Sequence, residues 1–592
     1  MFAKQINKKL RTGFKKIKDH WKFLRSLSIK HWRHLLRGLT RGEINLILFW
    51  LGLAIVSLGF MSGYDYWALR TAAPAVGGGY SEGLVGEPRY LNPILASTNE
   101  VDRDITTLIF SGLVKHDNRG QIIPDLAASY KISADGKTYE FTLRDKLFWP
   151  DNKPLTSDDV VFTLNLIKDG KYQSPLRNNW QGIKIEKIDD KKLNIKLPVQ
   201  YEPFLENAAV GILPQHLWAN IQPQNFLLTQ LNTKPIGLGQ YQLAKITKNA
   251  AGSIRSMELS PNPKYYQKAN IAKLVLRFYE NQEDLISGYK RGEIDGFSLN
   301  SPKEKDDIKN RSVNFYNLKL PRYFAVFFNQ PKSDVLSDVN VRKALGYATD
   351  RKTIAEEILK NEAEAQSGPF PFGVLKLEPP DKTYEFNIET AADLLDKAGW
   401  KKSSENGIRE KKLSGQKKKT SLEFTLTTTD WPELTQVASL LKTDWEKIGA
   451  KVNLDVVPVN AIQLQTIRPR EYEALLFGEV LGLNPDPFSF WHSTQRKDPG
   501  LNLSAYSNKK VDGLLESARQ MLSPQEKIKK YSEFQNIIMN DLPAIFLYSP
   551  NYIYAVSNKV KGIETEAINT PSQRFENINQ WYISTTRVKS SE

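Results

Sequence analysis

The sequence predicts an α/β protein that follows a single membrane-spanning helix. Apolar residues alternate over Leu422–Thr427, recur with helical spacing over Leu434–Ile448, and alternate again over Val452–Val457. This strand–helix–strand order is the building block of an open α/β lobe. The run Ile44–Tyr64 contains no charged residue. The roughly 520 residues beyond it are enough for two or more lobes with large cores.

The run Ile44–Tyr64 is expected to cross the membrane with the N-terminus in the cytoplasm. At about 1.5 Å per residue it spans a hydrocarbon core of roughly 30 Å as one helix. Residues 1–42 carry 13 Lys or Arg and one acid, Asp19, so they supply +12 of the net charge of +16. A positive flank stays inside, and the aromatic pair Tyr66 and Trp67 suits the far interface. The body beyond the run is therefore expected outside the cytoplasmic membrane.

Two other interpretations of this run remain open. A cleaved signal peptide would need a small-residue cleavage site, and the one candidate, Ala73-Pro74-Ala75, has a proline at its centre. A buried core helix would not need so uneven a charge flank. Before the run, residues 1–43 place apolar residues at helical spacing between lysines, which predicts a basic amphipathic helix on the anionic inner leaflet. Nucleic-acid binding and a passive topology signal are the alternatives for this leader.

Composition excludes several kinds of chemistry. The absence of Cys excludes disulfides, a thiol nucleophile and Cys-ligated zinc. No G-x-S-x-G, H-E-x-x-H, P-loop or complete G-x-G-x-x-G motif occurs. His116, His216 and His492 are not at metal-ligand spacing. We therefore expect no enzyme activity, no cofactor and no metal.

Two stretches of the body carry clear local signals. Thr71–Gly79, which is rich in Ala and Gly, is expected to be a flexible linker. Further on, Asp135-Gly136 predicts a hairpin turn before the alternating strand Thr138–Leu143. Thr156 or Ser157 then caps a helix whose first turn holds two acids, which suit the helix dipole.

This region resembles the family 5 extracellular solute-binding proteins, the oligopeptide, dipeptide and nickel receptors of ATP-driven importers. The matching residues are Asp125-Leu126-Ala127, Asp135-Gly136, Phe141-Thr142-Leu143-Arg144, Asp151, Pro154, Thr156 and Asp159-Val160. The resemblance runs from Gly78 to about Trp581. Its later matches are Pro235–Tyr241, Asn262–Tyr266, Ile294-Asp295, Asn329, Val339–Arg351 and Ala391–Trp400.

The resemblance implies a two-lobed periplasmic-binding-protein-like fold of type II, in the large peptide-receptor class, with an inserted subdomain. The expected divisions are a leader at 1–43, a transmembrane helix at 44–64, a linker at 65–77, lobe I at 78–113, 235–320 and 548–592, its insert at 114–234, and lobe II at 321–547.

The stretch Phe477–Trp491 bears most directly on the ligand. In the peptide receptors that the chain resembles, the matching stretch carries an Asp that pairs with the ligand's free α-amino group. This chain has Leu481 at that position. Glu479 is expected to point to the opposite strand face. We therefore expect a ligand that does not depend on a free amino terminus.

The resemblance implies a cleft between the lobes, and we expect seven residues to bind the ligand there: Trp149, Trp431, Glu479, Leu481, Asn484, Asp486 and Trp491. A purely structural interpretation is that Asn484–Phe488 is only a rigid turn, because its two prolines fix the backbone.

Together these features predict a membrane-anchored receptor, monomeric and without a nucleic-acid partner. It would capture peptides or peptide-like compounds by lobe closure and deliver them to the permease subunits of an ABC importer. A surface peptide sensor or chaperone without a transport partner is one alternative. A hydrolase built on a receptor scaffold is another.

Overall fold

The computed structural model describes residues 39–68, 70–308, 312–371, 375, 377–413, 415, 417–521 and 523–589. Residues 1–38, which hold most of the predicted basic leader, lie outside the described residues. The chain forms two compact units. One is residues 75–584, and the other combines residues 1–74 with 585–592.

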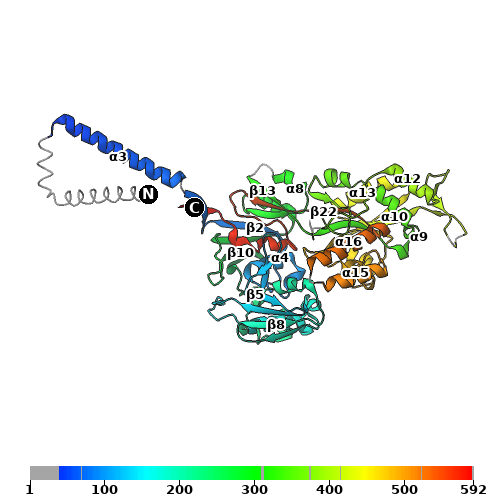
Figure 1. Ribbon diagram of the computed structural model, residues 1–592, viewed down its shortest axis with the longest axis horizontal. Helices are drawn as coiled ribbons and strands as arrows, with labels where there is room; N and C mark the ends of the chain where they lie inside the picture. Colours follow the sequence, from blue (N-terminus) through cyan, green and yellow to red (C-terminus); the bar gives the residue numbers. More distant parts are fainter. Residues whose placement is uncertain are drawn as a thin grey trace, which may run out of the picture. The chain divides into compact units, whose positions relative to one another are not determined.

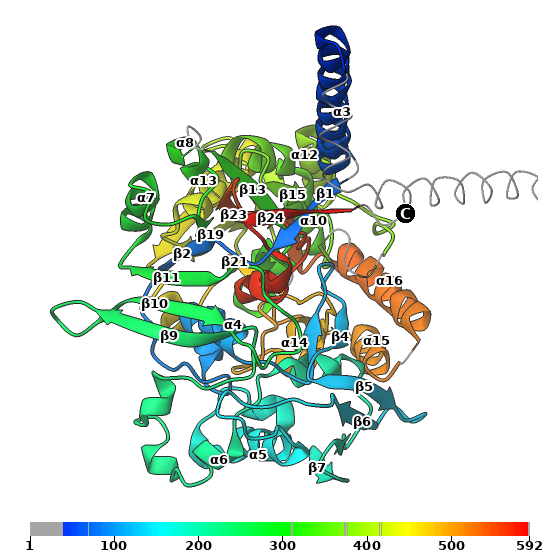
Figure 2. The same ribbon diagram turned by 90° about the vertical axis from the view of Figure 1, so that its left-hand side faces the viewer.

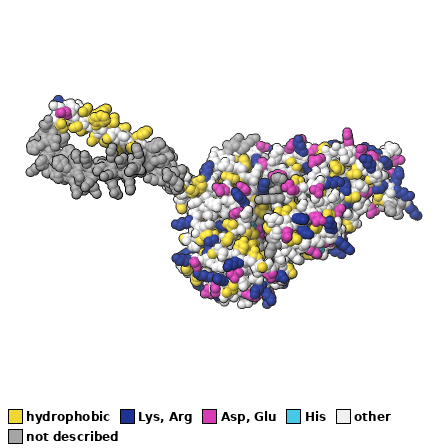
Figure 3. Space-filling model, viewed as in Figure 1, with side chains coloured by type: hydrophobic (Ala, Val, Ile, Leu, Met, Phe, Trp, Pro, Cys, Tyr) yellow, Lys and Arg dark blue, Asp and Glu magenta, His cyan; other side chains and the backbone are white. Residues whose placement is uncertain are grey.

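The smaller unit contains helix α3 (Arg41–Ala68). A capping box begins this helix, because the Thr40 N–H donates to Glu43 Oε2 at 2.8 Å and the Glu43 N–H donates to Thr40 Oγ1 at 3.4 Å. Its segment Arg41–Met61 is long and apolar enough to cross a membrane, and none of the most apolar stretch is buried inside the structure. Figure 3 shows these apolar side chains in yellow along the helix. An uncleaved anchor and a signal sequence share these properties.

The expected flexible linker has regular structure instead. Helix α3 continues to Ala68, and strand β1 (Arg70–Ala75) pairs with β24 (Ser584–Lys589) in a two-stranded sheet. The prediction of a flexible linker over Thr71–Gly79 was therefore wrong for its first half. The backbone of β1 finds its partner at the far end of the chain, and local composition carries no sign of such a partner.

The first lobe of the larger unit is built on a seven-stranded mixed sheet in the order β13-β23-β12-β2-β11-β10-β9. Its strands are β2 (Gly79–Val85), β9 (Tyr241–Lys248), β10 (Ile254–Pro261), β11 (Lys273–Tyr279), β12 (Gly296–Leu299), β13 (Val313–Leu318) and β23 (Tyr552–Ser557). Central β2 runs parallel to both β11 and β12. The helices of this lobe are α4 (Glu100–Ile109), α7 (Gln282–Lys290) and α8 (Glu304–Ile308).

An inserted four-stranded sheet, here called the insert, shares one apolar core with the first lobe. It is antiparallel in the order β5-β6-β8-β7, with β5 (Ala127–Ile132), β6 (Thr138–Leu143), β7 (Lys184–Lys187), β8 (Lys192–Lys196) and the helices α5 (Ser157–Lys168) and α6 (Gln215–Trp218). Gly136 has a φ of 64° in the predicted turn. Thr156 and Asp159 form a capping box at α5. Both local predictions are confirmed.

The second lobe is built on a six-stranded sheet in the order β15-β22-β14-β21-β19-β20. Its strands are β14 (Arg322–Phe328), β15 (Ala363–Ala365), β19 (Glu423–Thr429), β20 (Lys451–Val457), β21 (Ala474–Val480) and β22 (Ala544–Pro550). Its helices are α9 (Asp334–Ser337), α10 (Val339–Tyr347), α11 (Arg351–Thr353), α12 (Ile388–Lys397), α13 (Pro432–Lys447), α14 (Phe488–Trp491), α15 (Lys509–Arg519) and α16 (Pro524–Asp541). Strand β19 pairs parallel with β20 across helix α13, so the predicted βαβ unit is confirmed.

The chain passes between the two large sheets twice. Strand β13 leads into β14 through residues 319–321, and β22 leads into β23 through Asn551. Figures 1 and 2 show α15 and α16 of the second lobe (orange) on the same side of the molecule as the insert (cyan). Two short connections between two separately packed sheets are the usual structure of a hinge.

Candidate functional site

A large cavity of the described residues has a volume of about 920 Å³. Its walls come mainly from three parts of the chain that are distant in sequence, with His116 in addition: residues 178–209 of the insert, residues 481–520 of the second lobe, and residues 569–573 near the C-terminus. A volume of this size is within the range of ligand-binding pockets. The cavity therefore lies where movement of the two lobes would open or close it.

Polar contacts join the insert to the second lobe at the edge of this cavity. The ammonium group of Lys527 on α16 lies 2.5 Å from Glu202 Oε2 and 2.8 Å from Asn484 Oδ1. The Asn484 side-chain amide donates to the same Glu202 oxygen at 3.1 Å. Only 5% of the Lys527 side chain is exposed. We call Glu202, Asn484 and Lys527 the crossing triad.

A second charged pair lines the cavity beside the crossing triad. Arg519, the last residue of α15, donates from Nε to both carboxylate oxygens of Asp486, at 2.8 and 3.0 Å, and from Nη2 at 2.5 Å. The Arg519 guanidinium also lies 3.7 Å from the ring centre of Phe488. The Tyr201 hydroxyl donates to Asp486 at 3.4 Å from the insert side. The Asp486 carboxylate is thus occupied by groups of its own chain.

His116 lies on the first-lobe wall between two carboxylates. Its Nε2 is 2.9 Å from Glu206 Oε2, and its Nδ1 is 3.1 Å from Glu576 Oε2. Burial by itself would lower the pKa of this imidazole, but the charges and hydrogen bonds of Glu576 and Glu206 outweigh burial and raise the pKa to about 10. His116 is therefore a cation near neutral pH, and its charge is balanced locally.

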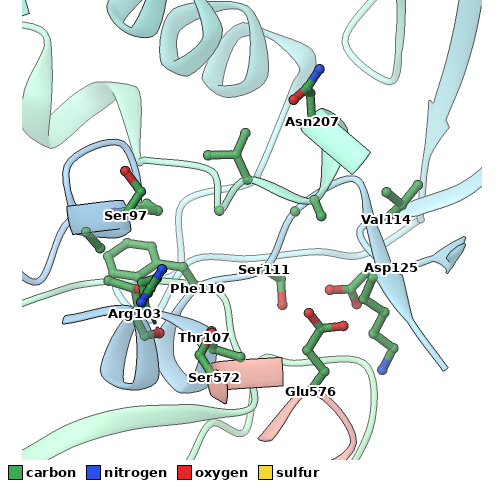
Figure 4. A pocket seen from close by; sticks show the side chains of 18 of the residues that line it. Ser97, Arg103, Thr107, Phe110, Ser111, Val114, Asp125, Asn207, Ser572 and Glu576 are labelled. Atoms are coloured by element: carbon green, nitrogen blue, oxygen red, sulfur yellow. Dashed lines mark hydrogen bonds between the residues drawn. The ribbon is translucent and has the colours of Figure 1, made fainter. Parts of the chain in front are cut away.

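A smaller pocket of about 250 Å³ adjoins the large cavity and shares Glu206, Asn207 and Ala209 with it. Figure 4 shows the side chains of Ser111, Asp125 and Glu576 directed toward one another in this pocket. Asp125 is buried and accepts hydrogen bonds from the hydroxyls of Tyr265 at 2.7 Å and Tyr266 at 2.9 Å. Burial raises the pKa of Asp125 despite nearby Lys115 and these hydroxyls. The acids of this pocket, like those of the large cavity, have partners within the chain.

A protein-family model matches the part of the chain that forms most of these walls. The model for bacterial extracellular solute-binding proteins, family 5 (middle), matches residues 121–501. This match covers more than half of the chain, including the insert and most of the second lobe. The chain belongs to family 5 of the bacterial extracellular solute-binding proteins.

Relatives and solved structures in family 5 agree in length and fold. Oligopeptide-binding protein AppA of Bacillus subtilis is 27% identical over 86% of this chain and 92% of its own. Its structure in complex with a nonapeptide has a TM-score of 0.66 at 26% identity and covers 86% of this chain and 100% of that chain. The substrate-binding protein CtaP of Listeria monocytogenes has a TM-score of 0.74 at 26% identity, with 86% and 99% covered. NikZ of Campylobacter jejuni, in complex with Ni(L-His), has a TM-score of 0.67 at 27% identity, with 85% and 99% covered.

These comparisons confirm the predicted family and the predicted two-lobed α/β fold. The family and these relatives are binding proteins rather than enzymes. In this chain, the described residues contain no group of three or more His, Cys, Asp or Glu placed to hold a metal ion.

Three of the seven predicted site residues line the large cavity: Leu481, Asn484 and Asp486. Leu481 directly follows β21, its N–H donates to the Pro321 carbonyl at 2.8 Å, and 8% of it is exposed. Asn484 belongs to the crossing triad and Asp486 pairs with Arg519. The stretch Asn484–Phe488 is thus a turn that also forms part of the cavity wall.

Glu479 lies in the core of the second lobe and not on the cavity wall. It faces Tyr323 across the β14–β21 ladder and accepts a hydrogen bond from the Tyr323 hydroxyl. Burial raises the pKa of Glu479 well above its usual range. Glu479 was expected to point to the face opposite Leu481. That expectation rested on wrong geometry, because strand residues two positions apart share a face. Leu481 differs from Glu479 because β21 ends at Val480.

The three predicted tryptophans do not line the large cavity. Trp149 is fully buried in the insert, where its indole N–H donates to Asp159 at 3.5 Å. Trp491 is buried in the core of the second lobe against Phe327, Tyr506 and Phe546. Trp431 is 39% exposed and lies beside Phe324 in a separate pocket of about 60 Å³. The expectation that Trp149, Trp491 and Glu479 contact a ligand is corrected by this burial.

Sequence reasoning missed the residues that shape the cavity most. Arg519, Lys527 and Glu202 belong to no recognised motif, and His116 was considered only as a metal ligand. Only the three-dimensional proximity of distant segments reveals them.

Proposed function

We propose that this protein binds peptides or peptide-like compounds in the cavity of about 920 Å³ between the insert and the second lobe. The observation that supports this most is the position of the cavity. Its walls belong to both lobes, and the chain passes from one large sheet to the other through residues 319–321 and Asn551. AppA, which is similar over 86% of this chain, is an oligopeptide-binding protein with a nonapeptide complex.

Lobe closure is the mechanism that we propose for capture. Ligand contacts made by both walls exist only in the closed form, so binding shifts the lobes toward closure. Of the predicted site residues, we propose that Leu481, Asn484 and Asp486 contact the ligand and that Trp431 lies near the hinge. We propose lobes divided as the sequence predicts, with the last boundary at Asn551, because β22 (Ala544–Pro550) pairs within the second sheet.

The proposal includes an anchor and a transport partner. Helix α3 holds the protein in the membrane, its basic leader lies on anionic lipid in the cytoplasm, and the closed body docks on the permease subunits of an ABC importer. The length and apolarity of residues 41–61 and the charge of residues 1–42 support the anchor. Membrane fractionation tests it. Mature protein with an N-terminal sequence starting near Ala73–Gly77 contradicts it.

Binding at this cavity is tested by blocking it. Gln520 lines the cavity at the end of α15 and its side chain is exposed, so Gln520→Trp adds bulk without disturbing a core. We expect calorimetry of the full-length protein with a peptide mixture to show binding that falls at least tenfold in this variant. The matched control is Lys510→Trp on the same helix, away from the cavity. Equal affinity in both variants contradicts the proposed site.

The permease partner has a separate test. Affinity purification of the full-length protein from cross-linked membranes is expected to recover integral-membrane permease subunits. Recovery of the receptor alone would favour a surface sensor or chaperone with no transport partner.

A further inference from the structure

The acidic and basic side chains that line the large cavity all contact other groups of the chain. The lining contains five such residues: His116, Glu206, Asp486, Glu516 and Arg519. His116 pairs with Glu206, and Asp486 pairs with Arg519, at the distances given above. Glu516 lies 3.3 Å from Nε2 of His492. Apart from Glu516, whose side chain is 61% exposed, the charged side chains that line the cavity each contact an opposite charge of the same chain.

The remaining polar lining consists largely of carboxamides. Asn178, Asn179, Gln181 and Asn207 contribute from the insert, and Gln520 and Asn569 contribute from the other two walls. A carboxamide carries two donors and an acceptor and has no charge. Such side chains can donate hydrogen bonds to amide and hydroxyl groups and can also accept hydrogen bonds from them. Apolar Leu481, Pro203 and Phe204 complete the walls.

A charged ligand group would be costly in this cavity. A buried ion needs an opposite charge, and pairing it with Asp486 or His116 would break an existing pair and leave another ion uncompensated. The bidentate contact of Arg519 with Asp486 is the strongest kind of pair between side chains. An uncharged ligand avoids this exchange.

We infer that the cavity takes an uncharged ligand rich in amide or hydroxyl groups. This inference rests on the proposed function, which assigns binding to this cavity, and it adds that neither end of the ligand carries a charge there. Peptides with both termini blocked and neutral saccharides share this chemistry. Arg519 and Asp486 then act as a masking pair, each hiding the other's charge from the ligand.

The test compares ligand libraries on the full-length protein in detergent. The protein is incubated with two tetrapeptide libraries of uncharged residues, one acetylated and amidated at its ends and one with free termini, and with tri-N-acetylglucosamine. Retained compounds are counted by mass spectrometry. We expect retention of the blocked library at least tenfold above the free library. Equal retention, or preference for free termini, overturns the inference while leaving peptide binding intact.

The third probe separates this inference from the proposed function. Retention of tri-N-acetylglucosamine with neither peptide library contradicts peptide binding and supports an uncharged ligand. Retention of none of the probes counts against both.

A charge-unmasking variant tests the masking pair directly. Arg519→Gln leaves the Asp486 carboxylate without its cation. The retention of peptides with a free amino terminus should therefore rise at least tenfold relative to that of blocked peptides. The control is Lys510→Gln on the same helix, which removes an exposed pair with Glu533. If Arg519→Gln does not fold, Asp486→Asn is used instead and leaves the Arg519 guanidinium without its acid. The retention of peptides with a free carboxylate should then rise. An unchanged preference in the folded variant overturns the inference.

Discussion

The ammonium group of Lys527 lies 2.5 Å from Glu202 Oε2, and this contact joins the second lobe to the insert across the mouth of the cavity. The two residues are 325 positions apart in the sequence. Because Lys527 is 95% shielded from solvent, removal of its partner leaves a buried cation with Asn484 as its remaining acceptor. The pair therefore stabilises the arrangement of the insert and the second lobe that this structure shows.

Glu202→Gln should open the ligand-free protein. A hydrogen bond to a charged group contributes about 1.5–3 kcal/mol, which is enough to shift an open–closed equilibrium roughly tenfold. The chain has no Cys, so Cys introduced at the exposed positions Lys184 and Lys529 allow spin labelling of the insert and α16. Double electron–electron resonance should show a longer distance in the variant.

The matched control is Glu533→Gln on α16, the helix that also carries Lys527; this change breaks an exposed ion pair with Lys510 of α15. Exposed pairs contribute little, so this variant should keep the wild-type distance. Identical distances in Glu202→Gln and wild type would show that the crossing triad does not hold the lobes together.

His116 should make stability fall as the pH rises above neutral. The folded-state pKa is raised to about 10, above the unfolded value of about 6.5. The stabilisation is therefore fully present below pH about 6.5 and is lost as the pH rises toward 10. Urea unfolding of the full-length protein between pH 6 and 10 should show this decline. His116→Gln should flatten it, and an equally steep decline in the variant would remove His116 as its source.

Leu481→Asp should create an amine site. Leu481 follows β21 and lines the cavity. The peptide receptors that the chain resembles are expected to carry an Asp at this position, and a leucine supplies no carboxylate there. With an Asp in place, peptides with a free amino terminus should gain affinity over their N-acetylated forms, measured by calorimetry on one scaffold. A wild-type loss of a hundredfold or more on acetylation would refute the expectation that the free amine is not needed.

Trp149→Phe should lower stability without changing affinity. Trp149 is completely buried in the insert, so loss of the larger ring and of its contact with Asp159 should cost about 1–3 kcal/mol in urea unfolding. Ligand affinity should stay within about twofold. A large loss of affinity at unchanged stability would place Trp149 in the site after all.

Local patterns predicted the local structure well. Thr156 and Asp159 are three residues apart, so the capping box follows from their identities alone. The βαβ unit ending at β20 follows from hydrophobic periodicity and from Gly449, whose φ of 88° ends the helix. The family resemblance then predicted the two lobes, because it rests on an ordered set of such local motifs.

The site was harder to predict because it depends on contacts between distant segments. Asp486 was expected to face a ligand, yet its carboxylate is taken by Arg519, 33 residues further along the chain. Glu479 lies within β21 and faces Tyr323 in the core, whereas Leu481 lies just beyond the end of the strand on the cavity wall. Trp149 and Trp491 are of a residue type that is common in ligand-binding walls, but both side chains are buried in a core. Burial and pairing of this kind are properties of the packed chain.

The central claim is that this protein holds a peptide-like ligand in the cavity between its insert and its second lobe. Native mass spectrometry of the full-length protein, extracted from membranes of the cells that make it, tests this claim most directly. We predict a co-purified compound containing amide bonds, present on the wild type and on Lys510→Trp and lost from Gln520→Trp. An equal amount of that compound on Gln520→Trp, or a wild-type protein that carries and binds no such compound, would contradict the account.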